Sequence, residues 1–99
     1  MSELKSEVIS FLRQEKPRLQ AIGIRSVGCF GSVVRGEERP DSDIDILIDV
    51  QQDSSLSLFS LLALEQEYSE RLRHKVDLVV ASDLRPQLGE KILAEVEYA

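Results

Sequence analysis

The chain has 99 residues, of which 42% are hydrophobic and 30% are charged, and its formal net charge is −6. A chain of this length fits one compact domain, so residues 1–99 are expected to fold as a single unit. The acidic balance argues against direct nucleic-acid binding, which needs clustered Lys and Arg. One cysteine excludes an intrachain disulfide, and no stretch approaches the ~20 apolar residues of a membrane span or forms an apolar signal segment. A cytoplasmic protein that does not bind membranes is therefore expected.

The first third of the chain predicts a helix and then a strand. Apolar residues at helical spacing predict the helix: Leu4, Val8, Phe11 and Leu12. Pro17 is expected to kink this helix or make it restart, because proline fits poorly in a helix interior, and Gly23 is expected to end it. The segment 26–30 predicts a short strand with Val27 and Cys29 on one face.

A second strand is predicted over residues 43–50, after a helical turn at 33–35 and a charged loop at 36–41. Its side chains alternate strictly between the two faces. The expected inner face is Ile44, Ile46, Ile48 and Val50, and the expected outer face is Asp43, Asp45, Leu47 and Asp49.

The last part of the chain predicts a helix, a strand and a further helix. A helix that ends near Arg73 is predicted by apolar residues expected to be buried: Leu58, Leu61, Leu64, Tyr68 and Leu72. The segment 76–80 is almost continuously apolar, which predicts a central strand. A final amphipathic helix is predicted by Leu88, Ile92, Leu93 and Val96. The order of elements predicts an α/β (α+β) fold, with a small mixed sheet of three or more strands packed by helices.

Three carboxylates stand out because strands normally exclude them. Asp43 and Asp45 lie two residues apart on one predicted strand, so their side chains leave the same face, which suits two oxygen donors that share hard cations such as Mg²⁺. Asp77 interrupts the apolar segment 76–80 and needs a partner, because an ionised carboxylate buried alone is very costly. That partner is either a metal shared with the other two aspartates or a cation such as Lys75.

A phosphate site is predicted where the first strand ends. Gly31 permits close approach of a ligand to the backbone, and the N–H groups at the start of the next turn, with the Ser32 hydroxyl, can bind an anion. Arg35 lies one turn further and either contacts phosphate or braces the aspartate loop by an ion pair. Ten residues separate Ser32 from Asp43, enough for the chain to reverse and bring the aspartates beside the glycine. Together these features favour metal-dependent nucleotidyl transfer, in which Asp77 positions or deprotonates the acceptor hydroxyl.

The segment from Gly31 to Gly36, followed by Ser42 to Ile46, resembles the signature of polymerase-beta-like nucleotidyltransferases, and more narrowly the minimal nucleotidyltransferase (MNT) antitoxins of HEPN/MNT toxin–antitoxin systems. The family pattern reads Gly-Ser, ten residues, Asp-x-Asp, with a third acid on a later strand that Asp77 matches. Val34 departs from the alanine usual before the arginine.

This resemblance implies that Asp43, Asp45 and Asp77 are the catalytic acids and hold two Mg²⁺ ions. It also implies that ATP phosphates bind at Gly31 and Ser32, with Arg35 and Ser42 in the same matched segments. Family members that are active transfer AMP to a hydroxyl, typically a tyrosine, of the partner toxin and so inactivate it.

The resemblance leads to an expected function and two alternatives. The chain is expected to be an antitoxin that neutralises a cognate HEPN ribonuclease toxin by adenylylation. It is expected to form a hetero-oligomer with the toxin, and a homodimer is the second assembly considered. Its brevity leads us to expect that a partner completes the site. One alternative is an antitoxin that blocks its toxin by binding alone. The other is a nucleotidyltransferase that acts on RNA or on a small molecule such as an antibiotic.

Overall fold

The computed structural model describes residues 3–54 and 56–99, and its helices and strands form one α+β domain around a mixed sheet. The elements are α1 (Glu3–Ala21), β1 (Ile24–Phe30), α2 (Ser32–Arg35), β2 (Ile44–Val50), α3 (Leu58–Leu72), β3 (Val76–Val80), a 3₁₀ turn (Ala81–Asp83), α4 (Pro86–Glu95) and β4 (Glu97–Tyr98). The strand order is β3-β2-β1-β4, with β2 and β3 parallel and the other pairs antiparallel. The predicted fold class is confirmed.

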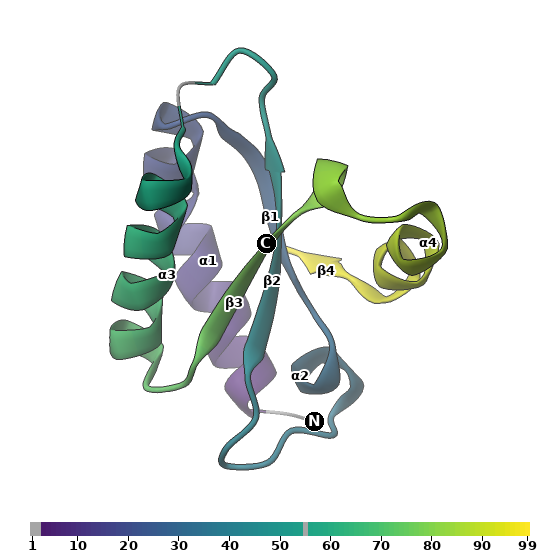
Figure 1. Ribbon diagram of the computed structural model, residues 1–99. Helices are drawn as coiled ribbons and strands as arrows, with labels where there is room; N and C mark the ends of the chain where they lie inside the picture. The colour runs from purple at the N-terminus through teal and green to yellow at the C-terminus, as the bar shows by residue number, and fades with distance from the viewer. Residues whose placement is uncertain (1–2, 55) are drawn as a thin grey trace.

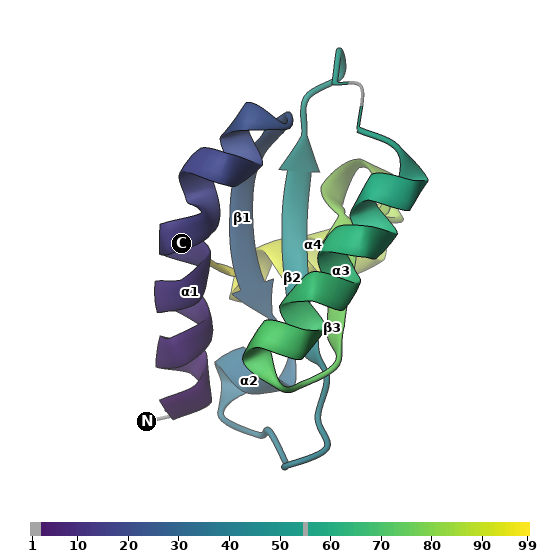
Figure 2. The same ribbon diagram turned by 90° about the vertical axis from the view of Figure 1, so that its left-hand side faces the viewer.

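Helices α1 and α3 cover one face of the sheet (Figures 1 and 2). The core lies between them and the strands, and the alternation of β2 explains it, because Ile44, Ile46 and Ile48 all point into this layer and are fully buried. Val27 and Cys29 of β1 lie in the same core, as predicted. The predicted inner face of the sheet is therefore confirmed.

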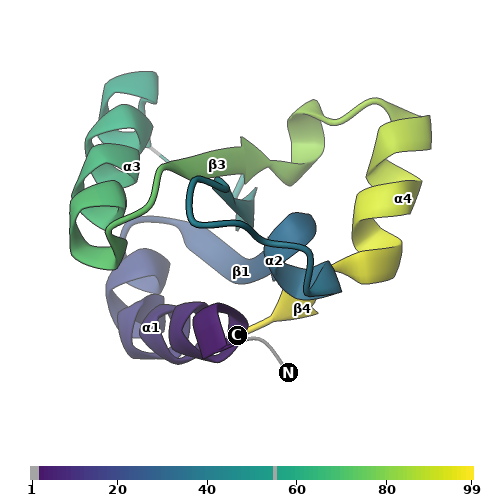
Figure 3. The ribbon, with the colours of Figure 1, turned by 90° about the horizontal axis from the view of Figure 1, so that it is seen from below.

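The opposite face of the sheet carries a smaller apolar cluster and helix α4 (Figure 3). Phe30, Leu47 and Ile92 are buried there, with Val79 and Val96 packed against them. This face is only partly covered, since Asp45, Asp77 and Val79 on it are half-buried. The strand residues beyond this cluster are therefore accessible from the α4 side.

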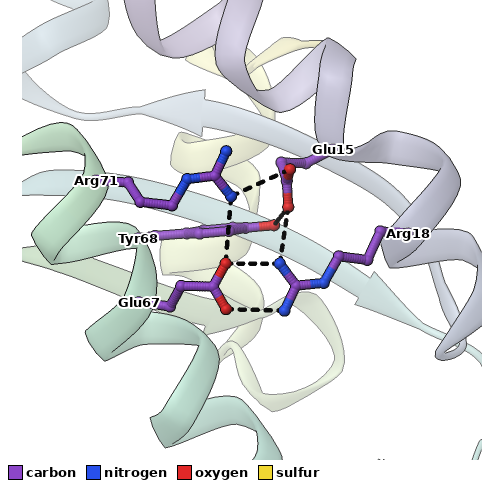
Figure 4. Close-up of polar contacts among 5 residues, drawn as sticks. All are labelled: Glu15, Arg18, Glu67, Tyr68 and Arg71. Atoms are coloured by element: carbon purple, nitrogen blue, oxygen red, sulfur yellow. Dashed lines mark hydrogen bonds and ion pairs between the residues drawn. The ribbon is translucent and has the colours of Figure 1, made fainter.

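A polar cluster joins α1 to α3 on the outside of the main core (Figure 4). Arg18 and Glu67 form a bidentate ion pair with distances of 2.6 and 2.8 Å, and Arg71 bridges Glu15 and Glu67. The Tyr68 hydroxyl, whose ring is buried, donates a hydrogen bond to Glu15. The two helices that cover the sheet are thus fixed to each other as well as to the strands.

Strand β3 lies at the edge of the sheet, so its predicted central position is wrong. Val76 is buried and the strand's other apolar side chains are half-buried, because helix α3 covers this edge on one face and Ile92 packs near the other. Side chains of α3 also cap its outward backbone groups: Ser69 Oγ accepts the N–H of Val76 at 2.9 Å, and Glu65 accepts the N–H of Leu78 at 2.8 Å. An edge strand sheltered in this way has the composition of a central one.

Four further details differ from the sequence predictions. Helix α1 continues through Pro17, because Leu12 and Leu19 on either side of it are both buried against the sheet and hold the helix together across the missing hydrogen bond. Leu58 was expected in the buried stripe of α3 but is 69% exposed, because the helix begins there, at the end of the covered region. Strand β1 begins at Ile24, and β4 was not predicted, since it is only two residues long.

Candidate nucleotidyltransferase site

The strand register brings the predicted acids together. Asp45 is paired with Phe30 of β1 on one side and with Asp77 of β3 on the other. Both aspartates lie on the face that carries α4, because they alternate with core residues of the opposite face. Asp43 lies in the loop directly before β2, and its charge acts on Asp45. Asp45 and Asp77 therefore share one side of the sheet, and Asp43 adjoins them at the start of β2.

Electrostatics at this site are dominated by uncompensated negative charge. The pKa of Asp45 is raised, first because the carboxylate is partly buried, and then because Asp77 and Asp43 repel its charge. Arg35 opposes this shift only in part. Among the ion pairs in the described residues none involves these three aspartates, and the predicted alternative of a Lys75 partner for Asp77 is not among them.

Gly31 stands directly beside the Asp45 carboxylate. Its φ of 82° lies in the left-handed region that favours glycine, and a Cβ built there would collide with the Asp45 carboxylate oxygen. Glycine is therefore required at this position twice over, by backbone conformation and by space. The sequence predicts that Gly31 lets a ligand approach the backbone closely. In the structure the group that approaches it is the Asp45 carboxylate.

The remaining predicted phosphate-binding residues lie in α2 and in the loop before β2. Ser32 is half-buried at the first position of α2, directly after Gly31. Ser42 is also half-buried, but its hydroxyl accepts the backbone N–H of Arg39 at 2.7 Å and so closes the loop before β2. Arg35 forms ion pairs with Glu37 at 2.7 Å and with Glu95 at 2.9 Å. The predicted ion pair therefore exists, and its partners are a glutamate of the 36–41 loop and the last residue of α4.

Glu95 is a residue of this site that the sequence did not reveal. It is the last residue of α4, and its carboxylate accepts both the Gly31 N–H at 3.3 Å and the Arg35 guanidinium. Its side chain is 22% exposed. No sequence signal marks it, because it lies 64 residues from Gly31 and outside any motif.

The donor chemistry of the three aspartates fits a divalent cation. Carboxylate oxygens are the donors that Mg²⁺ prefers, and the raised pKa of Asp45, which partial burial and its acidic neighbours cause, marks a place where positive charge is missing. As the side chains stand, no group of three His, Cys, Asp or Glu residues in ranges 3–54 and 56–99 is placed to hold a metal ion. The carboxylates of Asp43, Asp45 and Asp77 would therefore have to turn toward one another to share one.

Residues 5–98 match the family of nucleotidyltransferase domains. The chain belongs to this family. It is 41% identical over 93 residues to protein adenylyltransferase MntA of Thermococcus cleftensis, a match that covers 93% of this chain and 92% of the relative. The predicted family and enzyme class, a nucleotidyltransferase, are confirmed.

Solved structures share the fold of this nucleotidyltransferase. A chain described as a minimal nucleotidyltransferase superposes with a TM-score of 0.70 at 31% identity, covering 90% of this chain and 93% of that one. A toxin–antitoxin complex with AMP-PNP gives a TM-score of 0.70 at 23% identity, covering 95% of this chain and 70% of that one, and this likeness concerns the fold alone. Nucleotidyltransferases of this family are typically metal-dependent. No helix in the described part of the chain is long and apolar enough to span a membrane.

Proposed function

We propose that this nucleotidyltransferase is a protein adenylyltransferase, which transfers AMP from ATP to a hydroxyl of a HEPN ribonuclease toxin, a tyrosine by preference, and thereby acts as its antitoxin. The observation that carries the proposal is the position of Asp45, held between Phe30 and Asp77 by the strand register and against the Cβ-free backbone of Gly31. A relative that is 41% identical over nearly the whole chain bears the name protein adenylyltransferase, which supports the same activity.

In this proposal Asp43, Asp45 and Asp77 hold two Mg²⁺ ions that arrive with ATP. The bound ions would neutralise phosphate charge and stabilise the attacking and leaving oxygens. Asp45 and Asp77 face one side of the sheet, and none of the three acids has an ion-pair partner in the described residues, so they are available for this role. Repulsion between them, which contributes to the raised pKa of Asp45, would be relieved by the cations.

The proposed phosphate-binding groups lie around Gly31. The Gly31 N–H and the Arg35 guanidinium already bind a carboxylate, which shows that both can bind an anion. Ser32 lies beside them at the start of α2, and Ser42 lies just before the strand that carries the aspartates. In this proposal Asp77, on the edge strand, positions the acceptor hydroxyl or takes its proton. The acceptor oxygen then bonds to the α-phosphorus, and pyrophosphate leaves.

The proposed partner is a HEPN toxin in a hetero-oligomer with this chain, in the cytoplasm, where ATP is available. Structures with the same fold include MntA–HepT complexes and a tri-AMPylated HEPN toxin of Shewanella oneidensis bound to its MNT antitoxin. These are properties of those proteins at 21% identity, and they indicate which partner to test first.

The test uses labelled ATP, Mg²⁺ and a HEPN toxin encoded by the adjacent reading frame. The wild-type chain should label the toxin, and Asp43→Asn/Asp45→Asn should abolish labelling but still co-purify with the toxin. Asp49→Asn is the matched control, because Asp49 lies on the same strand four residues beyond Asp45 and forms an ion pair with Arg25. Protection of cells by the double variant would favour an antitoxin that acts by binding alone. Labelling of RNA or a small molecule instead of the toxin would move the acceptor to another class.

A further inference from the structure

Glu95 occupies groups that the proposed nucleotide needs. Its Oε1 accepts the Gly31 N–H at 3.3 Å, and both of its oxygens lie within 3.2 Å of Arg35 Nη1. A carboxylate and a phosphate present similar oxygens to such donors. Two of the donors proposed for the triphosphate, the Gly31 N–H and the Arg35 guanidinium, are thus already bound to an acid of the chain itself.

The position of Glu95 is unfavourable within its own helix. It is the last residue of α4, whose last turn contains no basic residue, and a negative charge at a helix C-terminus opposes the helix dipole. Among the hydrogen bonds of the described residues, only those with Gly31 and Arg35 compensate for this unfavourable position. The carboxylate is therefore held by the site, not by α4.

Glu95 also adds to the negative charge that an incoming triphosphate meets. Arg35 is the cation that the proposed phosphates would use, and Glu95 and Glu37 both form ion pairs with it. A polyphosphate cannot bind Arg35 and Gly31 fully while this carboxylate stays in place.

We infer that Glu95 is a built-in competitor for the phosphate groups of the nucleotide, which holds the site closed until a metal-bound triphosphate displaces it. The inference rests on the proposed use of ATP at this site. Displacement needs only rotation of the Glu95 side chain, because β4 anchors the backbone that follows through the pairing of Cys29 with Glu97. Nucleotides with few phosphates are excluded most strongly, since they gain too little to replace the carboxylate.

The first test compares nucleotide affinity in matched variants. Glu95→Gln keeps the shape and removes the charge, and it should bind AMP-PNP with Mg²⁺ about threefold to tenfold more tightly than wild type. Inorganic triphosphate should show the same gain, whereas adenosine should show none. Glu37→Gln is the control, because Glu37 pairs with the same arginine but does not contact Gly31. Its effect should stay within about twofold.

The second test follows the Gly31 amide by NMR. Its resonance should move on Glu95→Gln substitution and again when AMP-PNP and Mg²⁺ are added to the wild type, since the substitution removes the charge of the acceptor and the nucleotide replaces the acceptor. Unchanged or weaker binding by Glu95→Gln, with wild type still binding AMP-PNP, would show that Glu95 positions Arg35 and would overturn the inference alone. Failure of both proteins to bind AMP-PNP would overturn the inference and the proposed function together.

Discussion

The hydroxyl of Tyr68 donates a hydrogen bond to Glu15 at 2.9 Å and so joins the buried ring of α3 to the polar surface of α1. The Tyr68 ring also meets Phe11 edge to face, with centroids 4.8 Å apart. Burial raises the pKa of Tyr68, and the hydrogen bond to Glu15 raises it further, so the phenol stays protonated as a donor. This pair links two helices that the sequence separates by 53 residues.

Tyr68→Phe should therefore lower the free energy of unfolding by about 1–2 kcal/mol, because it leaves part of the Glu15 carboxylate, only 12% exposed, without a donor. Urea denaturation measures this change. Tyr98→Phe is the matched control, since Tyr98 is 50% exposed, and its effect should stay below about 0.5 kcal/mol. Equal effects of the two substitutions would contradict a role for the Glu15 bond.

The ion pairs of Glu67 predict an acid-dependent loss of stability. Its hydrogen bonds with Arg18, and then with Arg71, lower the pKa of Glu67 from 4.5 to about 2. A lowered folded-state pKa stabilises the fold above the unfolded value, and this contribution is lost as the pH falls from about 4.5 to about 2. Because the side chain is 36% exposed, solvent screens the pair and the contribution should stay below about 1 kcal/mol.

Denaturation across that pH range should show a shallower acid loss for Glu67→Gln than for wild type. Glu70→Gln, which changes an exposed glutamate of the same helix, serves as the control and should follow wild type. A Glu70 variant that also flattens the profile would mean that general charge repulsion, not the Arg18 pair, sets the acid response.

Gly31→Ala should both destabilise the fold and abolish nucleotidyl transfer, because the new methyl collides with the Asp45 carboxylate at a positive φ. Gly36→Ala separates the two causes. Gly36 also has a positive φ, of 73°, but a Cβ there meets nothing within 4 Å. We expect a cost of about 1 kcal/mol for Gly36→Ala from backbone conformation alone, and a larger cost for Gly31→Ala. Thermal melting of both variants measures the difference, and equal losses would exclude the collision.

Asp45→Asn should raise the Tm of the metal-free protein. The pKa of Asp45 is raised because burial and the charges of Asp77 and Asp43 disfavour its ionised form. A raised carboxylate pKa means that ionisation costs stability at neutral pH and that stability is regained as the pH falls through the raised value. The variant should therefore gain most above that pKa. Melting in EDTA at neutral and acidic pH tests this sign.

Added Mg²⁺ provides the complementary measurement. It should raise the Tm of wild type and have a much smaller effect on Asp45→Asn, because ligand binding stabilises only the protein that retains the donor. Asp49→Asn is the control, since its carboxylate pairs with Arg25 at 3.1 Å and its removal should not raise the Tm in EDTA. A Tm gain from Asp49→Asn equal to that from Asp45→Asn would point to net charge as the cause.

Local patterns in the sequence were sufficient to predict much of the fold and the acid cluster. Strict alternation from Asp43 to Val50 assigns each side chain of β2 to a face, and it placed Asp45 on the correct side. The same period explains why Asp77 faces that side too, once β3 pairs with β2 in register. Period and motif spacing therefore predicted which side chains share a face.

Features that depend on distant partners could not be predicted in this way. The edge position of β3 follows from which strands pair, and an edge covered by α3 has the same apolar composition as a central strand. Glu95 belongs to the site only because β4 runs back along β1 and carries the end of α4 to Gly31. Leu58 has the spacing of a core residue, but it is the first residue of α3 and its side chain is exposed at the end of the region that the helix covers.

The capped edge of β3 limits how this protein can associate. Ser69 and Glu65 use the N–H groups of Val76 and Leu78 that another chain's strand would otherwise need. Continuation of the sheet into a neighbouring molecule is thus blocked along this stretch, which protects a small β-containing protein from edge-to-edge aggregation. Any strand added to this sheet by a partner would therefore have to pair with the short β4 at the other edge.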